Sequence, residues 1–123
     1  MLVSKFNQQT GILVSKFEGN INLKEILDYI ISTKNNKTYP RHLKIITDAS
    51  QAVFNFSFTD LQSIVIENEK SLEQYDSITD AIIVTDPNTT ALSMLYKELE
   101  KNSKYEFNIF STKRASLEWL SQF

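Results

Sequence analysis

Strand-like and helix-like patterns alternate along most of this sequence. Two strand patterns come first, and from the second onward each strand pattern is followed by a helical one, which gives the order β-β-α-β-α-β-α-β-α. Such alternation is typical of an open sheet whose strands run parallel beyond the first pair and are joined by right-handed crossovers. We therefore predict an α/β fold with a single-layer, open, mixed sheet of about five strands.

The first two strand patterns, at residues 2–6 and 12–18, are separated by a polar stretch that ends at Gly11. Because glycine tolerates a positive φ, this arrangement predicts a β-hairpin. The second strand alternates between apolar and polar positions, which indicates a partly exposed strand, and it is predicted to end at Gly19.

Capping patterns locate the helix starts. Asn22 with Glu25 and Thr59 with Gln62 have the spacing of a capping box, and the apolar residues that follow at helical spacing predict helices to about residues 34 and 72. The remaining elements are predicted as strands at residues 43–48, 80–85 and 105–109 and as helices that begin at Asp86-Pro87 and at Ser111 or Thr112.

The last helix carries an apolar stripe that includes Ala115 and Trp119, four residues apart. A terminal helix is retained only if it buries such a stripe against the rest of the protein. We therefore predict that Trp119 belongs to the core.

Composition excludes several classes of function. The 123 residues, 41% of them hydrophobic, suit one domain over residues 1–123, with a core of its own. The absence of cysteine, the single histidine and the two glycines exclude disulfides, cysteine-based zinc sites, G-x-G-x-x-G turns and Walker loops. A net charge of -2 lacks the basic excess of nucleic-acid-binding proteins. We expect no cofactor and no nucleic-acid partner.

No apolar run approaches the roughly 18 residues that a membrane-spanning helix needs. The N-terminal stretch has no sustained apolar segment before Asn7. We therefore expect no transmembrane segment and a cytoplasmic location, with which the absence of cysteine agrees.

Asp48 and Asp86 follow two strands that are predicted to be parallel neighbours, at the edge where open α/β sheets bind ligands. Such a pair could bind a divalent cation and support a metal-assisted hydrolase. The alternative, which we favour, is that each aspartate accepts hydrogen bonds from turn amides. His42 is predicted to be a solvent-facing loop residue, because no nucleophile or orienting carboxylate accompanies it in the sequence.

Three phenylalanines alternate between the third strand and the next helix, at Phe54, Phe56 and Phe58. If the segment is extended, the three rings share one face, which could cover the core, line an apolar pocket or meet a partner subunit. Phe58 could also pack against the following helix as a hydrophobic staple. The segment is therefore the candidate interface or apolar pocket of the protein.

These patterns together resemble the SpoIIAA-like branch of the STAS superfamily (sulfate transporter and anti-sigma factor antagonist), and its stand-alone bacterial members in particular. The resemblance covers nearly the whole chain. It rests on the order, spacing and total length of Gly19-Asn20-Ile21-Asn22, Leu43-Lys44-Ile45-Ile46-Thr47-Asp48, Ala81-Ile82-Ile83-Val84 with Asp86-Pro87, and Phe110-Ser111-Thr112 with Ala115 and Trp119-Leu120.

The resemblance implies a (βα) superhelix, which lipid-carrying CRAL-TRIO domains also use. Anti-sigma factor antagonists of this superfamily are protein-protein switches that a kinase phosphorylates at the start of the helix after the central strand. Ser57 and Thr59 are the corresponding candidate phospho-acceptors here. The family's Asp-Ser-Ser-Gly pattern is absent, and no glycine follows these positions.

The sequence thus favours a non-enzymatic, regulatory STAS-like domain that works through contacts with a protein partner or with a second copy of itself, as a homodimer. The alternative is a carrier or sensor of a small hydrophobic ligand or lipid. A well-formed apolar cavity would favour the carrier, and a large, flat apolar surface would favour the interaction domain.

Overall fold

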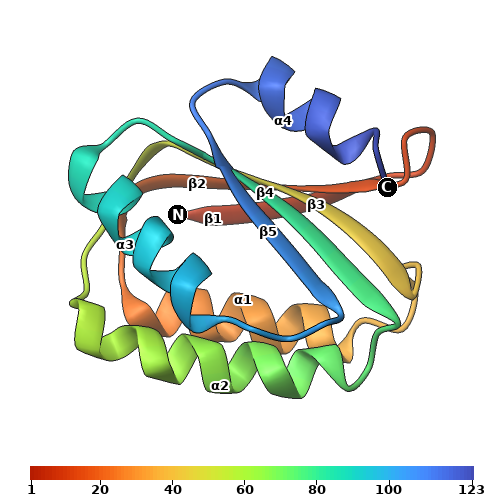
Figure 1. Ribbon diagram of the computed structural model, residues 1–123, viewed down its shortest axis with the longest axis horizontal. Coiled ribbons are helices and arrows are strands. Elements are labelled where there is room, and N and C mark those ends of the chain that lie inside the picture. Colours follow the sequence, from red (N-terminus) through yellow and green to blue (C-terminus); the bar gives the residue numbers. More distant parts are fainter.

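The structure is a computed structural model that describes residues 1–123. It contains one five-stranded sheet and four α-helices in the order predicted from the sequence, with one short 3-10 helix, η1 (Figure 1). The strands are β1 Leu2–Asn7, β2 Ile12–Ile21, β3 His42–Phe54, β4 Ser77–Val84 and β5 Tyr105–Phe110. The helices are α1 Leu23–Asn35, η1 Phe58–Asp60, α2 Leu61–Leu72, α3 Pro87–Leu99 and α4 Lys113–Leu120.

The strands lie side by side in chain order, from β1 at one edge of the sheet to β5 at the other. β1 and β2 are antiparallel and form the predicted hairpin, whose turn ends at Gly11 with a φ of +71°. All other neighbouring strands are parallel. The prediction of a mixed sheet that is parallel beyond the first hairpin is confirmed.

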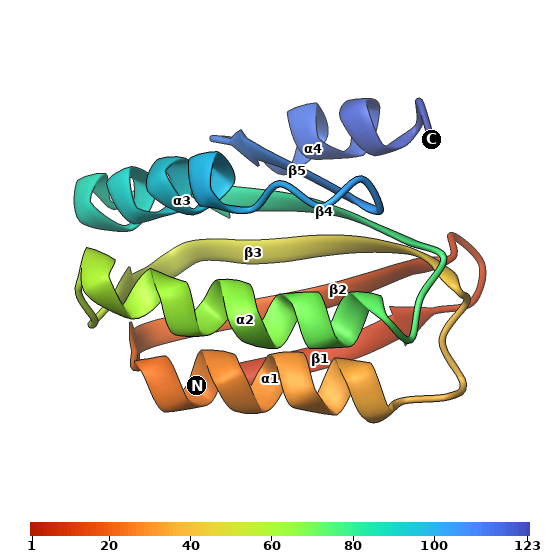
Figure 2. The ribbon, with the colours of Figure 1, turned by 60° about the horizontal axis from the view of Figure 1, so that its bottom comes forward.

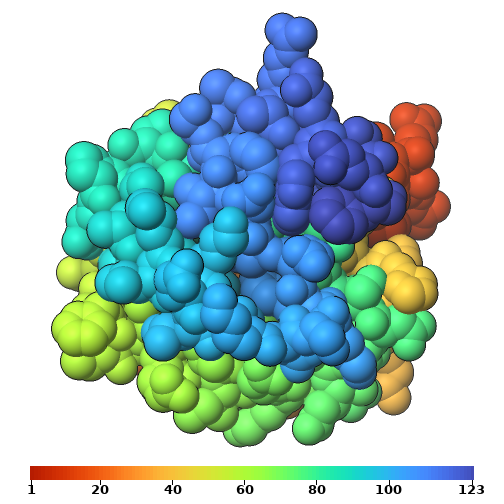
Figure 3. Space-filling model, viewed as in Figure 1, coloured from red at the N-terminus to blue at the C-terminus, as the bar shows by residue number.

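Three helices, α1, α2 and α3, pack on one face of the sheet, and α4 packs on the other (Figures 1 and 2). α1, α2 and α3 are the three crossover helices, and each connects a strand to the next strand on the same side. Crossovers of the same handedness that progress in one direction along a sheet place their helices on the same face. α4 follows the last strand and joins no further one, so it can fold back over the opposite face. In the space-filling view, α3, β5 and the chain between them occupy the middle of the visible face, with α4 above and α2 below (Figure 3).

Two strands continue well beyond their predicted ends. β2 continues through Gly19, which has a φ of +73°, to Ile21, and β3 continues past Asp48 to Phe54. The added parts pair with each other, up to Ile21 opposite Phe54, beyond an irregularity in β2 after Lys16. The second half of β3 lacks the β-branched pattern of the first half, so backbone pairing with β2 rather than side-chain propensity holds it extended.

The predicted capping box of Thr59 with Gln62 is wrong. Ser57 is instead the capping residue of η1, and its N–H donates to Asp60 Oδ2 at 3.0 Å. α2 begins only afterwards, at Leu61. The sequence contains several Ser, Thr and Asp side chains that can cap in this segment, and the choice among them depends on where β3 ends.

The other helix starts lie where the caps predicted them. Asn22 and Glu25 form a capping box, with bonds of 2.9 and 3.2 Å between each side chain and the other residue's N–H. Asp86 caps α3 by accepting from the N–H of Thr89 at 2.9 Å. Thr112 caps α4 by accepting from the N–H three residues later at 3.2 Å.

Trp119 is only half-buried, so the prediction that it belongs to the core holds in part. Its ring packs against Phe110 at 5.6 Å and Phe123 at 5.0 Å between ring centroids. The fully covered anchor of α4 is Leu120, which packs on Ile46 beneath it. None of the helices combines the length and the hydropathy needed to cross a membrane.

Candidate functional site

A cavity of about 90 Å³ lies between the sheet and the helices α1, α2 and α3. Fifteen of its 21 lining residues are hydrophobic, and they come from these three helices, from strands β2 to β5 and, for Phe56, from the connection between β3 and η1. Large side chains such as Phe17, Tyr29 and Tyr96 stand between the two layers. Protein interiors are close-packed, and voids of this size are few in a domain. The cavity is therefore the main candidate for a binding site.

Asp80 is the only charged residue among those that line the cavity. It projects from β4 on the same face as Ile78 and Ile82, because side chains alternate along a strand. Thr47 Oγ1, on the neighbouring β3, donates to Asp80 Oδ1 at 2.8 Å. The hydroxyl of Tyr105, on β5, donates to Oδ2 at 3.3 Å. Each carboxylate oxygen thus has one donor.

Burial raises the pKa of Asp80 to about 6, although the hydrogen bonds from Thr47 and Tyr105 act in the opposite direction. The side chain lies inside the protein, yet Asp80 is not fully covered, because it faces the cavity. At neutral pH most molecules therefore carry a carboxylate in a mainly apolar cavity. The described residues place no cationic side chain in the lining of this cavity.

Aromatic rings from β5 and α3 stand beside this carboxylate. Phe107 lies opposite Asp80 in the register of β4 and β5. Its ring is edge-on to Tyr96 at 5.0 Å and stacked with Tyr105 at 6.0 Å. The hydroxyl of Tyr96 in turn donates to that of Tyr105 at 3.3 Å. Burial raises the pKa of both tyrosines well above the usual value, so both hydroxyls stay protonated.

Sequence reasoning missed Asp80 because it placed the start of this strand at Asp80 itself. β4 begins at Ser77, and in that frame Ile78, Asp80 and Ile82 share the covered face. A charged residue at a position that the strand period assigns to the core is the signal that could have identified the site.

The three candidate phenylalanines have different environments. Phe54 belongs to the buried core at 7% exposure, and Phe56 is half-buried and stacks on it at 5.3 Å. Both rings line the cavity. Phe58, by contrast, is 64% exposed. The three rings therefore do not share one face, because the extended backbone ends at Phe54 and η1 begins at Phe58.

Asp48 and Asp86 lie on opposite sides of the sheet. Asp48 is within β3, on the face that carries Ile46 and α4, and its Oδ1 accepts from the N–H and hydroxyl of Ser50 at 3.1 and 2.6 Å. Asp86 is engaged in the first turn of α3, where its Oδ2 accepts from the N–H and hydroxyl of Thr89. These contacts favour local structural roles for both carboxylates.

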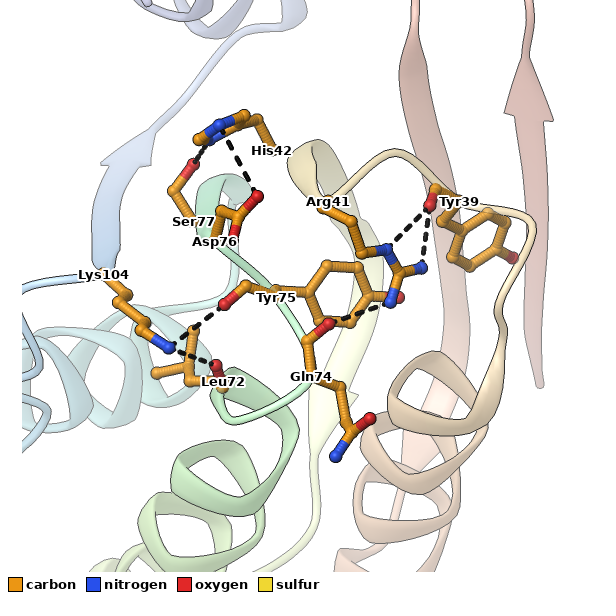
Figure 4. A network of polar contacts seen from close by, with 9 residues as sticks. All are labelled: Tyr39, Arg41, His42, Leu72, Gln74, Tyr75, Asp76, Ser77 and Lys104. Carbon is orange, nitrogen blue, oxygen red and sulfur yellow. Dashed lines mark hydrogen bonds and ion pairs between the residues drawn. The ribbon is translucent and has the colours of Figure 1, made fainter.

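His42 has neighbours that the sequence did not reveal (Figure 4). Its Nδ1 lies 2.9 Å from the hydroxyl of Ser77, and its Nε2 lies 3.8 Å from Asp76. The group is exposed, and the N–H groups of Asp76 and Ser77 both donate to the carbonyl of Arg41 at 2.8 and 3.1 Å. Neither of these two amides is therefore free to stabilise an oxyanion.

Arg41 and Lys104 hold the loops at this end of the sheet together (Figure 4). The Arg41 guanidinium stacks on the ring of Tyr75 at 4.2 Å and donates to the carbonyls of Tyr39 and Gln74. The Lys104 ammonium donates to the carbonyls at the end of α2 and just beyond it, at 3.1 and 3.2 Å. These cations satisfy backbone carbonyls and are therefore structural.

Glu100, which does not line the cavity, also has a raised pKa. Burial and the adjacent Glu69 carboxylate raise the pKa of Glu100 to about 8, and hydrogen bonding to Glu100 lowers the pKa of Glu69. Glu100 is 6% exposed, and its Oε1 has no hydrogen-bond partner. Asn68 and Asn102 donate to the pair at 3.3 and 2.6 Å. A raised pKa beside a second carboxyl group is typical of a pair that shares one proton.

The architecture around the cavity can be compared with solved structures. A protein of the DUF3478 family from Shewanella loihica PV-4, described as uncharacterised and as having a SpoIIAA-like fold, superposes with a TM-score of 0.59. The two sequences are 16% identical, and the match covers 98% of this chain and 92% of the other. This chain has a SpoIIAA-like fold. No family model matches the sequence, and no curated protein sequence matches it significantly.

In this SpoIIAA-like fold, Ser57 and Thr59 lie at the exposed start of η1, between the central strand β3 and α2. Their hydroxyl oxygens are 2.7 Å apart, and Ser57 also contacts the Asp60 carboxylate. A phosphate group there would be close to that negative charge, which disfavours it. Both residues remain candidate phospho-acceptors.

Proposed function

We propose that this SpoIIAA-like domain is a non-enzymatic, regulatory domain that binds a small hydrophobic ligand in its interior cavity. The observation that carries the proposal is the cavity itself, with 15 hydrophobic residues among the 21 that line it. Ligand pockets have this chemistry: mostly apolar walls and a small number of polar groups that fix orientation.

Packing energetics support the proposal. Side chains that border an empty volume lose dispersion contacts that a ligand would restore. The rings of Phe54 and Phe56 stack on each other at one part of the wall, and Tyr96 and Phe107 meet edge-on at another. The lining holds one charged group, Asp80, which is hydrogen-bonded to Thr47 and Tyr105. An apolar ligand can therefore contact the rest of the wall without breaking a charged network.

The exposed ring of Phe58 favours a second candidate function, contact with a protein partner or a second copy of the chain. An exposed phenylalanine beside the Ser57 and Thr59 hydroxyls gives an apolar anchor next to polar groups, as found at interaction sites. We expect Phe58→Ser to leave stability unchanged and to abolish self-association, measured as mass by light scattering. An unchanged dimer, or a monomer in both proteins, would exclude this ring as a self-association contact.

Ligand binding is tested with toluene, an apolar probe of about one ring. Chemical shifts of cavity residues should move saturably in a ¹H–¹⁵N correlation spectrum of the full chain. Ser93 lines the cavity and is 3% exposed, so Ser93→Leu should fill the space and abolish the shifts. Ser63→Leu, the same change at an exposed position of α2, is the matched control and should bind as the wild type does. Absence of saturable shifts in the wild type would refute the proposal.

A further inference from the structure

We propose that the cavity selects a small organic amine, whose apolar body fills the space between the layers and whose protonated amino group pairs with Asp80. This inference rests on the proposed function and adds the chemical class of the ligand. It comes from the position of one carboxylate in a cavity wall that is otherwise uncharged.

The carboxylate of Asp80 has unused acceptor capacity toward the cavity. Thr47 and Tyr105 each donate one hydrogen bond to it, at 2.8 and 3.3 Å. A carboxylate offers about four lone-pair sites, so two donors leave room for an ammonium group. Asp80 lines the cavity and is only partly covered by protein, so we expect a bound ligand to reach these oxygens.

The described residues include no counter-ion in the cavity wall. The titratable groups that face Asp80 are Tyr29 from α1, Tyr96 from α3 and Tyr105 from β5, and burial holds the pKa of each above its usual value. α2 contributes the neutral side chains of Asn68 and Ser71. A charge in an apolar environment is costly unless it is paired, so a cationic ligand offsets a cost that the two hydrogen bonds compensate only in part.

The aromatic rings beside Asp80 suit the same ligand. Tyr105 and Phe107 are stacked on β5, and Tyr96 is edge-on to Phe107. Faces and edges of such rings accommodate the apolar body, and a ring face also attracts an ammonium group. A carboxylate together with aromatic rings therefore recognises a protonated amine with an attached hydrocarbon.

The cavity volume restricts the size of the ligand. About 90 Å³ is below the roughly 150 Å³ of an engineered apolar cavity that binds benzene. The body of the ligand therefore cannot exceed about one ring, and a ring fits only if side chains of the cavity wall shift outward. Benzylamine, benzyl alcohol and toluene form a matched series at this upper limit, which differs only in the polar group that would face Asp80.

The first test measures dissociation constants of the three probes by NMR titration of the full chain at pH 7.5. We expect benzylamine to bind at least about tenfold more tightly than toluene or benzyl alcohol, because hydrogen bonds between charged groups are stronger than those between neutral groups. Asp80→Asn should remove this preference, so that the three probes bind with similar affinity. Asp76→Asn, the same change at an exposed position, is the control and should keep the preference.

A second test needs no variant. Benzylamine stays protonated between pH 5 and pH 7.5, whereas Asp80, with a pKa of about 6, changes from mostly protonated at pH 5 to mostly ionised at pH 7.5. Its affinity should therefore fall about tenfold at pH 5, and the affinity for toluene should not change. If toluene binds and benzylamine shows neither preference nor pH dependence, the amine inference is refuted while the proposed function stands. If no probe binds, both fail.

Discussion

The backbone N–H of Phe54 donates a 3.0 Å hydrogen bond to Thr89 Oγ1, and so joins the end of β3 to the first turn of α3. The Thr89 hydroxyl donates in turn to Asp86 Oδ2 at 3.0 Å. Thr89 is fully buried. One hydroxyl thus connects the capping residue of α3 with the strand that carries a cavity-lining ring.

Thr89→Val should lower the free energy of unfolding by about 1–3 kcal/mol, because it keeps the side-chain volume and leaves the buried N–H of Phe54 without an acceptor. Thr89→Ser keeps the hydroxyl and should cost less, since it loses only a methyl group. Urea denaturation of the three proteins checks this. A Val variant as stable as the wild type would mean that water replaces the hydroxyl.

Asp80→Asn should increase stability at neutral pH. The pKa of Asp80 rises from a usual 3.8 to about 6 in the folded protein, so the folded state holds this proton more tightly than the unfolded state does. The unfolding free energy of the wild type therefore falls as pH rises from about 4 to 6. Relative to the wild type, the Asn variant should gain up to about 3 kcal/mol across that window and no more above it.

This difference is measured by urea denaturation at pH 4, 5, 6 and 7. Asp76→Asn provides the control, because Asp76 is exposed and should not change the pH profile. A constant difference between Asp80→Asn and the wild type from pH 4 to 7 would contradict the raised pKa.

Glu100→Gln should remove a loss of stability at alkaline pH. The pKa of Glu100 rises from a usual 4.5 to about 8, mainly through burial, so the folded protein keeps the proton shared with Glu69 that the unfolded chain has already released. Wild-type stability should therefore decline between about pH 4.5 and 8, because ionisation of both carboxyl groups leaves two adjacent charges.

Thermal unfolding at pH 6 and pH 9 checks this prediction. The midpoint of the wild type should fall more between these values than that of Glu100→Gln. Glu98→Gln is the control, because Glu98 lies two residues earlier in the chain and is exposed, and this variant should behave as the wild type does. Parallel behaviour of all three proteins would mean that the pair does not share a proton.

Trp119→Ala should cost about 2 kcal/mol, less than the roughly 3–5 kcal/mol typical of a fully buried ring. The ring is half-buried between Phe110 and Phe123, and part of its surface stays in contact with water. Leu120→Ala, at a covered position of the same helix, should cost at least as much despite the smaller side chain. Urea midpoints that rank the two variants in the opposite order would contradict this assignment.

The order of elements was predictable because it depends on local periodicity, which the side chains of each segment carry. Where β3 ends was not, because backbone pairing between Ile21 and Phe54 decides it, and no local pattern marks such pairing. Because of that error, Phe54 was predicted to lie in a connection, whereas it ends β3 and belongs to the core. The cavity was also beyond sequence reasoning, since it is the space left when three helices pack on one sheet. Asp80 could have been identified if the strand had been predicted to begin at Ser77, because its position would then have fallen on the covered face.

The strand order in the sheet is the order in the chain. Every pairing therefore joins neighbours in sequence, and no strand has to wait for a later one to be inserted between it and its partner. Closing each such loop costs little chain entropy compared with a topology that pairs distant segments. The sheet can grow from β1 towards β5 in the direction of synthesis on the ribosome. α4, which alone covers the opposite face, would then be the last of these elements to dock.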